Sequence, residues 1–351
     1  MIDSKYAVAI VGFGGMGNWH REILEDFENL ICIGTYDIDP AKQKDASDHG
    51  LYPYGSLDEL VEDSKVDIVL ISTPNDVHKP IAIKAMRAGK TVVCEKPVTL
   101  SSNDLQEMID CAMENKVHFT VHQNRRWDED FLTIKKIYED NIIGEIFNVE
   151  SRVEGSWGIP DGWRTEKEHG GGMVLDWGIH ILDQLLLMFP EKVSKVFANL
   201  TYVTNGEVDD GFKIFLTFES GKTALLDVGT SNFITLPRWY LQGINGTAVI
   251  DDFSVKGKIV RIYNWEKREV VPVKTAAGLT KTMAPRSEDT IVECALPVVK
   301  SDIHDFYKNV VDVIEGKALP LIKHDELIRC MKLIEAVFES SRLNQVVDFE
   351  S

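Results

Sequence analysis

The first third of the chain alternates short apolar runs with amphipathic segments. Five runs of aliphatic and β-branched residues have the length of buried strands, and they lie at 6–11, 30–36, 67–72, 91–94 and 119–122. Between them, apolar residues recur at helical spacing, for example over 78–88 and 105–113. This regular alternation predicts a doubly wound α/β domain with a parallel sheet over residues 1–123.

The pattern changes after residue 123. A helix at 128–140 and a strand at 145–157 precede a second helix, which runs to Pro190. Strand patterns separated by turn signals follow at 194–202, 211–218, 223–229, 238–244, 247–251, 259–264 and 269–273. The stretch 275–290 has no periodicity and predicts a long loop, and helices at 300–315 and 324–342 close the chain. We therefore expect residues 124–351 to form an α+β domain with an open, mainly antiparallel sheet, whose last helix can pack back on the first domain.

Composition indicates a globular protein and excludes several classes. The 351 residues, 44% of them hydrophobic, can supply the cores of two domains. A net charge of −18 with no visible basic face argues against nucleic-acid binding. Neither a secretory leader nor an apolar stretch of about 18 residues is visible, which argues against a membrane protein. The five cysteines form no CxxC pair, so we expect reduced thiols and a cytoplasmic location.

A glycine-rich turn follows the first predicted strand directly and reads Gly12-Phe13-Gly14-Gly15-Met16-Gly17. A GxGxxG between a strand and a helix is typical of a Rossmann dinucleotide site, because the glycines permit a tight turn and close approach of the pyrophosphate. Asp37, 20 residues past Gly17, ends the second strand, where a carboxylate can bind the ribose hydroxyls and repel a 2′-phosphate. This favours NAD over NADP, although Lys42 and Lys44 leave room for NADP. The alternative is that the glycines only form a tight turn and Asp37 caps the next segment.

Two further polar turns follow strands of the same sheet. The third strand leads into Thr73-Pro74-Asn75, with His78 shortly after, and the fourth ends in Glu95-Lys96-Pro97. Ligands of open parallel sheets lie beyond the carboxyl ends of the strands, so both turns are placed to contact a cofactor. For the first turn, capping of the next helix by Asn75 or Asp76 is the alternative.

With these motifs, nearly the whole chain resembles the glucose–fructose oxidoreductase/inositol dehydrogenase (Gfo/Idh/MocA) family of NAD(P)-dependent enzymes. The resemblance also rests on Gln123-Asn124-Arg125-Arg126, Trp163-Arg164 and Asp176-x-x-x-His180. It implies oxidation of a carbinol of a sugar or cyclitol, with Lys96, Asp176 and His180 in the active site, and an open sheet that supports a homodimer or homotetramer. Residues 152–157 lack the histidine and asparagine of inositol dehydrogenases, which argues against inositol. Trp157 and Trp163 suggest a stacking surface for a pyranose ring.

The spacing of Asp176 and His180 predicts a shared helix face. Hydride transfer from a carbinol needs a base, so we expect His180 to accept the hydroxyl proton and Asp176 to orient its imidazole. Lys96 would donate to the substrate oxygen. Asp183, nearly on the same face, could bind a substrate hydroxyl or pair with a neighbour, and Arg126 could bind substrate or form an interdomain ion pair.

Several interpretations stay open on sequence alone. Trp163 and Arg164 can lie against cofactor or sugar, or can pack a hinge loop, and His169 is expected to be a loop histidine. A metal-assisted reaction is an alternative, because Asp176, His180 and Asp183 have ligand-type side chains at helical spacing. A metal site needs three or four convergent ligands, and Lys96 would be a poor neighbour for a cation, so no metal is predicted. Rival functions are an NAD-dependent redox glycosidase or epimerase with internal cofactor recycling, and a non-catalytic NAD-sensing regulatory protein.

Overall fold

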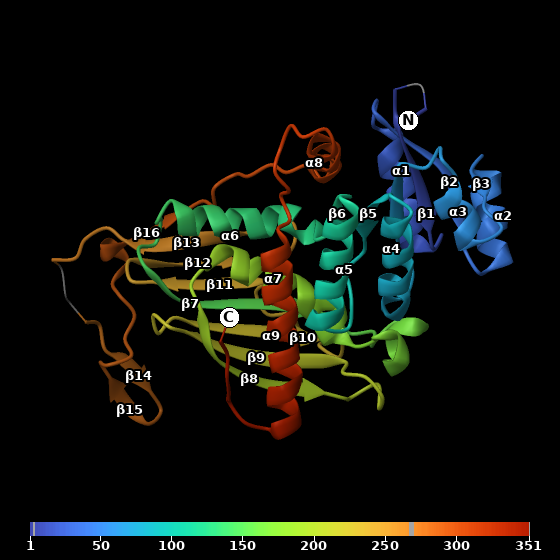
Figure 1. The fold of residues 1–351 in the computed structure, drawn as a ribbon. Helices are drawn as coiled ribbons and strands as arrows, with labels where there is room; N and C mark the ends of the chain where they lie inside the picture. Colours follow the sequence, from blue (N-terminus) through green and yellow to red (C-terminus); the bar gives the residue numbers. More distant parts are fainter. Residues whose placement is uncertain (3, 267–269, 351) are drawn as a thin grey trace.

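A computed structural model describes residues 1–2, 4–266 and 270–350 (Figure 1). Its first domain holds a six-stranded parallel sheet in the order β3-β2-β1-β4-β5-β6. The strands are β1 Tyr6–Val11, β2 Leu30–Tyr36, β3 Tyr52–Pro53, β4 Ile68–Ile71, β5 Thr91–Cys94 and β6 Phe119–Val121. The predicted doubly wound domain is confirmed. Only β3 escaped prediction, because two exposed residues carry no hydrophobic pattern.

Helices connect these strands on both faces of the sheet. They are α1 Gly15–Glu25, α2 Pro40–Asp48, α3 Leu57–Glu62, α4 His78–Arg87 and α5 Ser102–Asn115. Most begin with a side-chain cap, such as Ser101, whose Oγ accepts from Asp104 N at 3.1 Å. Helix α1 differs, since Gly14 precedes it without a side-chain cap and its first turn has no acidic residue. Its amino-terminal N–H groups are therefore available to an anionic ligand.

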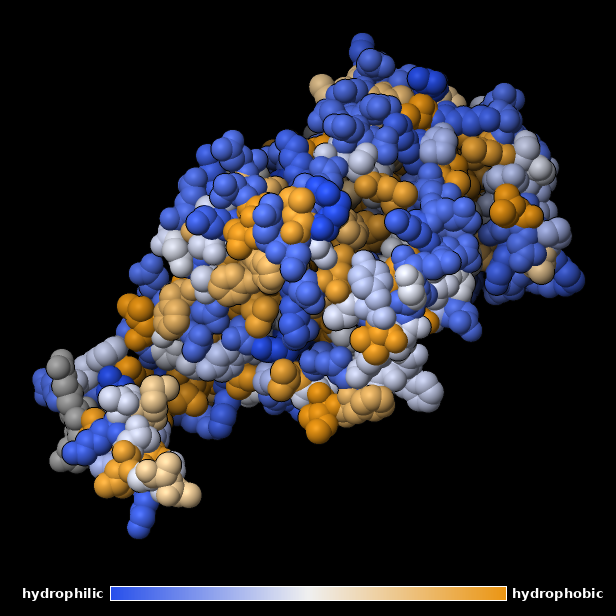
Figure 2. Space-filling view, turned by 90° about the horizontal axis from the view of Figure 1, so that it is seen from below, coloured by the Kyte–Doolittle hydropathy of each residue, from blue (hydrophilic) through white to orange (hydrophobic). Residues whose placement is uncertain are grey.

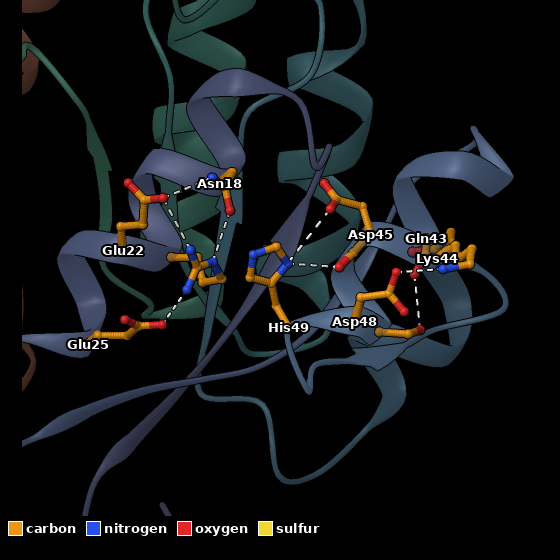
Figure 3. Close-up of polar contacts among 10 residues, drawn as sticks. Asn18, Glu22, Glu25, Gln43, Lys44, Asp45, Asp48 and His49 are labelled. Atoms are coloured by element: carbon orange, nitrogen blue, oxygen red, sulfur yellow. Dashed lines mark hydrogen bonds and ion pairs between the residues drawn. The ribbon is translucent and has the colours of Figure 1, made fainter.

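Helices α1 and α2 each carry charged side chains that form ion pairs within the same helix (Figure 3). On α1, Arg21 contacts Glu22 and Glu25, and on α2, Lys44 pairs with Asp48. Lys44 and Asp48 are exposed, so their pair contributes little to stability, whereas Arg21 is buried beneath its two exposed partners. This side of the first domain is a solvated surface.

The second domain holds a nine-stranded sheet in the order β16-β13-β12-β11-β7-β10-β9-β8-β17, and its only parallel pair among the described strands is β7 with β10. The strands are β7 Ile146–Glu154, β8 Val193–Thr201, β9 Gly211–Phe218, β10 Thr223–Gly229, β11 Trp239–Gly243, β12 Gly246–Ile250, β13 Gly257–Ile262, β16 Ile291–Cys294 and β17 Val347–Asp348. Alternation along β9 buries Phe212, Ile214 and Leu216 and exposes Lys213 and Phe215. The buried face is covered by helices (Figure 1): α6 Glu129–Glu139, α7 Ile179–Met188 and α9 His324–Leu343. The mainly antiparallel sheet is as predicted.

The carboxyl-terminal helices connect the two domains. Helix α8 (His304–Ile314) packs on the first domain, where the ring centroids of Phe27 and Tyr307 are 5.7 Å apart. Helix α9 stands in front of the large sheet beside α5 (Figure 1). Ser102 Oγ donates to Glu335 Oε2 of α9 at 2.9 Å, and Ala198 N of β8 donates to Ser340 Oγ near the carboxyl end of the same helix.

The predicted loop at 275–290 is wrong in part. Strands β14 (Val273–Thr275) and β15 (Gly278–Thr280) form a hairpin that stands out from the body of the molecule (Figure 2), and the chain then returns as β16. Most of the hairpin residues are exposed, which explains why they lack a hydrophobic period. Of the strand predicted at 269–273, Glu269 lies outside the described residues and 270–272 are not a strand.

Two broad sequence predictions concern cysteines and membrane helices. All five cysteines lie in described parts of the chain and none is in a disulfide. No helix within the described residues has the length and apolarity needed to cross a membrane.

Candidate functional site

A cleft of about 910 Å³ runs along the carboxyl ends of β1, β2, β4 and β5, and the second domain closes its far side. The first domain contributes residues from the glycine turn, the end of β2 and the turns after β4 and β5. The second domain contributes the residues Trp163, Arg164, His169, Asp176, Trp177 and His180. The cleft therefore brings together most of the site residues predicted from sequence.

The glycine turn leaves room for a ligand. Gly12 has a φ of +89°, and a Cβ there would lie 2.8 Å from Ser72 O. A Cβ on Gly17 would lie 2.2 Å from Gly12 O, so this glycine lets α1 pack against the turn. Gly14 and Gly15 have nothing within 4 Å of such an atom. With the uncapped start of α1, this open space fits the pyrophosphate of a dinucleotide.

Asp37 lines the same cleft directly after the end of β2. Its Oδ2 accepts from Phe13 N at 2.7 Å and its Oδ1 from Asp39 N at 2.8 Å, which fixes the carboxylate. The described cleft residues around it, Tyr36, Ile38 and Leu57, include no lysine or arginine. Lys42 and Lys44, which sequence reasoning kept as possible 2′-phosphate ligands, do not line the cleft.

The residues of the turn after β4 lie partly in the cleft and partly in the protein interior. Thr73, Pro74 and Asn75 line the cleft, and Asn75 Nδ2 donates to Gly170 O at 2.9 Å. His78, predicted as a cofactor contact, lies buried beneath the turn. Its ring nitrogens are 2.9 Å from Thr73 O and 3.0 Å from Pro97 O, so it joins the turns after β4 and β5.

Lys96 and Asp176 meet across the two domains. Lys96, before a cis bond to Pro97, donates from Nζ to Asp176 Oδ1 at 3.0 Å, and Arg164 Nε lies 3.5 Å from Asp176 Oδ2. Burial would raise the pKa of Asp176, but Lys96 and Arg164 hold that pKa below its usual value. The carboxylate is therefore ionised and pairs with two cations.

His180 is buried in the wall of the cleft, one turn beyond Asp176. Burial, together with the charges of Lys96 and Arg125, holds the pKa of His180 well below its usual value, so the imidazole is neutral. Its Nδ1 has no hydrogen-bond partner among the described residues. No bond within the described chain joins it to Asp176, contrary to the expected orienting contact. The helix begins as a π-helical turn, Val174–Gly178, and the Asp176 carboxylate is drawn to the two cations.

Arg125 is a cleft residue that sequence reasoning missed. Its guanidinium lies 4.0 Å from the Trp177 ring centroid, and its Nη1 donates to Asp128 at 2.9 Å. The neighbouring Arg126, which we expected there, forms a buried two-point ion pair with Asp183 at 2.6 and 2.7 Å. Neither Arg126 nor Asp183 lines the cleft. The motif places two arginines after β6, but only the three-dimensional course of the short 3-10 turn shows which one faces the ligand.

The aromatic surface differs from the expected one. Trp157 is 96% exposed and lies away from the cleft, because its loop faces solvent. Trp163 does line the cleft, with Arg164 stacked 4.5 Å above its ring, and Trp177 lines it as well. His169, expected to be an ordinary loop histidine, also lines the cleft, and its Nδ1 lies 3.0 Å from Asp76 Oδ1.

Glu95, predicted as a cofactor residue, reaches the cleft from within a buried polar cluster. Its Oε1 lies 2.9 Å from His20 Nε2 and 2.8 Å from His122 Nδ1, and His20 Nδ1 bonds Tyr307. Sequence reasoning missed the two histidines and the tyrosine, which come from three separate segments. His20, the sixth residue of the helix after the glycine turn, was the one available signal.

The convergent groups do not match the metal-assisted alternative. Asp183 faces Arg126, so Asp176, His180 and Asp183 do not form a ligand set. The described residues that bring possible ligands together are His20, Glu95 and His122, and the exposed group Glu166, Glu168 and His169.

Comparison with known proteins matches both domains of the chain to one family of oxidoreductases. A model of the oxidoreductase family with an NAD-binding Rossmann fold matches residues 6–123, and one of the GFO/IDH/MocA C-terminal domain matches residues 131–249. The crystal structure of an NAD-binding protein from Listeria innocua is 49% identical with a TM-score of 0.96, covering 99% of this chain and 100% of that chain.

Curated relatives are more distant. An uncharacterized oxidoreductase of Schizosaccharomyces pombe is 30% identical over 333 residues, 90% of each chain. The scyllo-inositol 2-dehydrogenase (NADP(+)) IolW of Bacillus subtilis is 28% identical over 351 residues, covering 98% of this chain and 96% of the relative. Together with the NAD(P)-binding cleft, these matches show that the chain belongs to the Gfo/Idh/MocA family of oxidoreductases.

Proposed function

We propose that the protein is an NAD-dependent dehydrogenase that transfers a hydride between a carbinol of a sugar, glycoside or cyclitol and the nicotinamide. The observation that carries the proposal is the ion pair of Lys96 with Asp176 beside the neutral, buried His180, at the end of the dinucleotide cleft opposite Asp37. A polar alcohol could approach all three side chains there.

Each side chain has a distinct task in this reaction. The nicotinamide, when bound, accepts the hydride. Neutral His180 accepts the hydroxyl proton, and the Lys96 ammonium donates to the same oxygen and stabilises its developing negative charge. Asp176 holds the Nζ of Lys96 in place, so its partner in our proposal is the lysine rather than the imidazole.

We propose NAD as the cofactor. The fixed Asp37 carboxylate, with no lysine or arginine among the cleft residues around it, favours a free ribose over a 2′-phosphate. The Bacillus subtilis relative is named for NADP(+), so the choice has to be measured for this chain. Comparing kcat/KM with NAD and with NADP decides it.

A substrate panel tests the reaction. Sugars, glycosides and cyclitols are incubated with NAD, and reduced nicotinamide is followed by its absorbance. We expect one chemical class to be oxidised, and His180→Gln to lower kcat by about 10²- to 10⁴-fold. Because the pKa of His180 lies well below its usual value, the imidazole is already neutral in this range. The pH profile of kcat/KM should therefore show no titration of His180 between about pH 6.5 and 8. Full activity of His180→Gln would remove the proposed base, whereas cofactor binding by the wild type without oxidation of any panel member would favour the non-catalytic, cofactor-sensing alternative.

A second candidate is a reaction with internal cofactor recycling. One relative, 30% identical over 264 residues and covering 73% of this chain, is the 2,7-anhydro-N-acetylneuraminate hydratase of Escherichia coli. A hydratase has no net redox change, so a related chain could oxidise and then reduce its substrate within one cycle. Substrate turnover without net NADH, with solvent deuterium entering the product, would favour this candidate over simple dehydrogenation.

We also propose that the protein forms a homodimer or homotetramer through the outer face of the large sheet. Phe197 and Phe215 lie opposite each other on neighbouring strands of that face and are 36% and 43% exposed. Light scattering of the wild type and of Phe215→Glu would test this, because a charge in the interface should dissociate the oligomer.

A further inference from the structure

In the buried cluster around Glu95, the contacts indicate which atom donates and which accepts in each hydrogen bond. Glu95 Oε1 faces His20 Nε2 and His122 Nδ1, so both nitrogens donate to it. His20 then carries its one proton on Nε2, and its Nδ1 accepts from the hydroxyl of Tyr307. His122 Nε2 faces no acceptor within the described chain, so Nδ1 is the ring nitrogen of His122 that donates within the cluster.

The cluster is closed to solvent except at the cleft. His20 and His122 are fully buried, Tyr307 is 3% exposed, and Glu95 alone lines the cleft. Burial would raise the pKa of Glu95, but His122 and His20 hold it well below its usual value, so the carboxylate is charged. Burial raises the pKa of the Tyr307 hydroxyl, which stays a donor. Glu95 therefore presents a permanent negative charge in a wall of low dielectric constant.

The members of the cluster come from distant parts of the chain. His20 lies on α1, Glu95 follows β5, His122 follows β6 and Tyr307 lies on α8. Tyr307 is outside both ranges matched by the family models, 6–123 and 131–249. The hydroxyl and the two imidazoles leave the Glu95 carboxylate little freedom to rotate, since His20 and His122 both donate to the same oxygen. Its other oxygen accepts from Lys96 N at 3.1 Å.

Glu95 is next to the residue that we assign to the alcohol oxygen. Hydride transfer requires the nicotinamide ring to lie beside that alcohol, and therefore beside Lys96 and Glu95. The oxidised ring carries a positive charge and the reduced ring none. We propose that Glu95, positioned by His20, His122 and Tyr307, is a fixed anion that makes the cleft bind the oxidised cofactor more tightly relative to the reduced one. This inference rests on the proposed function, which places the nicotinamide ring beside Lys96 and therefore beside Glu95.

The test compares two dissociation constants in the absence of substrate. Binding of NAD⁺ and of NADH is measured by titration calorimetry, and the ratio of the NAD⁺ constant to the NADH constant is taken for each variant. Glu95→Gln keeps the shape and removes the charge, and should raise this ratio about 10-fold. A ratio within about 2-fold of the wild-type value would overturn the proposal.

Matched pairs separate positioning from simple loss of packing. His20→Gln and His122→Asn each keep an amide donor where the imidazole nitrogen donates, whereas His20→Leu and His122→Leu do not. We expect the leucine variants to raise the ratio about 3-fold and the amide variants to restore it. Equal ratios in both members of each pair would show that the histidines have no positioning role.

A tyrosine pair controls for stability. Tyr307→Phe should raise the ratio modestly, by about 2-fold, because His20 loses the partner that fixes its tautomer. Tyr54→Phe removes another buried hydroxyl, which donates to Asp63 at 2.8 Å away from the cleft, and should leave the ratio unchanged. If the wild type binds neither cofactor, this inference and the proposed function both fail. If it binds both but oxidises no sugar or cyclitol, only the proposed function fails.

Discussion

The two ends of the cleft are built from different material. At the nucleotide end, the cleft offers a ligand the backbone over 12–17 and one carboxylate, Asp37, which backbone N–H groups fix. At the substrate end it offers side chains, and Lys96 meets Asp176 across 80 residues of chain. The first end depends on the shape of one strand–turn–helix unit, whereas the second depends on ion pairs between the domains.

The two ends should therefore respond to different kinds of substitution. A site built from backbone is altered when an added atom cannot fit, and its shape does not depend on contacts with the other domain. A site of paired charges is altered when one partner is removed, because the other keeps its desolvation cost without its ion pair. Substitutions at the nucleotide end should therefore act on cofactor affinity, and removal of Lys96 from its ion pair with Asp176 should act on the rate of reaction.

The largest effect is expected at the substrate end. Lys96→Met removes the donor to the substrate oxygen, and kcat/KM should fall about 10³-fold while the dissociation constant of NAD changes by less than about 3-fold. Steady-state kinetics and calorimetry measure the two quantities. Lys79→Met, which removes a surface ion pair with Asp104, serves as the control and should leave both unchanged. An affinity loss as large as the rate loss would contradict the separation of the two ends.

At the nucleotide end, Gly17→Ala should show the opposite behaviour. The new Cβ would lie 2.2 Å from Gly12 O and push α1 away from the turn. We expect NAD affinity to fall about 10- to 100-fold and stability to drop by about 1–3 kcal/mol. Calorimetry and urea unfolding give both values. Gly50→Ala, at a φ of +78° with open space around it, should cost stability without lowering affinity.

The same contrast explains what the sequence alone could predict. The strands of the first domain and the glycine turn follow from local pattern, because each residue's role depends on its neighbours in the chain. Lys96 and His180 were identified as site residues through the resemblance, and Asp37 through its spacing from the glycines. The ion-pair partners of Asp176 could not be predicted, because Lys96 and Arg164 come close to it only when the chain has folded.

Long-range packing also decided the remaining differences. Arg125 and Arg126 are neighbours with the same side chain, and the buried pair of Arg126 with Asp183 leaves Arg125 to face the cleft. Tyr307 carries no local signal of its contact with His20, which lies 287 residues away. The exposed β14–β15 hairpin has the opposite cause, because strands without a buried face leave no hydrophobic pattern.

A smaller effect is expected on the cofactor preference at the nucleotide end. Asp37→Asn keeps an acceptor for Phe13 N but removes the charge, so the preference for NAD over NADP in kcat/KM should fall about 10-fold. Asp39→Asn, at the cap of α2, is the matched control and should leave the preference unchanged. An unchanged preference in Asp37→Asn would show that the carboxylate does not select the cofactor.

The smallest effect concerns how the substrate end is held in place. Asp209 Oδ2 accepts from Val174 N at 2.7 Å at the start of the π-helical turn that carries Asp176, and burial raises the pKa of Asp209 to about 7. Because the folded pKa lies above the unfolded one, this group stabilises the fold at low pH, and that contribution is lost as pH rises through about 7. Between pH 6 and pH 8 the wild type should therefore lose about 1 kcal/mol relative to Asp209→Asn, which stays neutral and keeps an acceptor for Val174 N. Urea unfolding of both proteins across this range measures the difference, and stability curves that differ by the same amount at every pH would show that Asp209 does not titrate near pH 7.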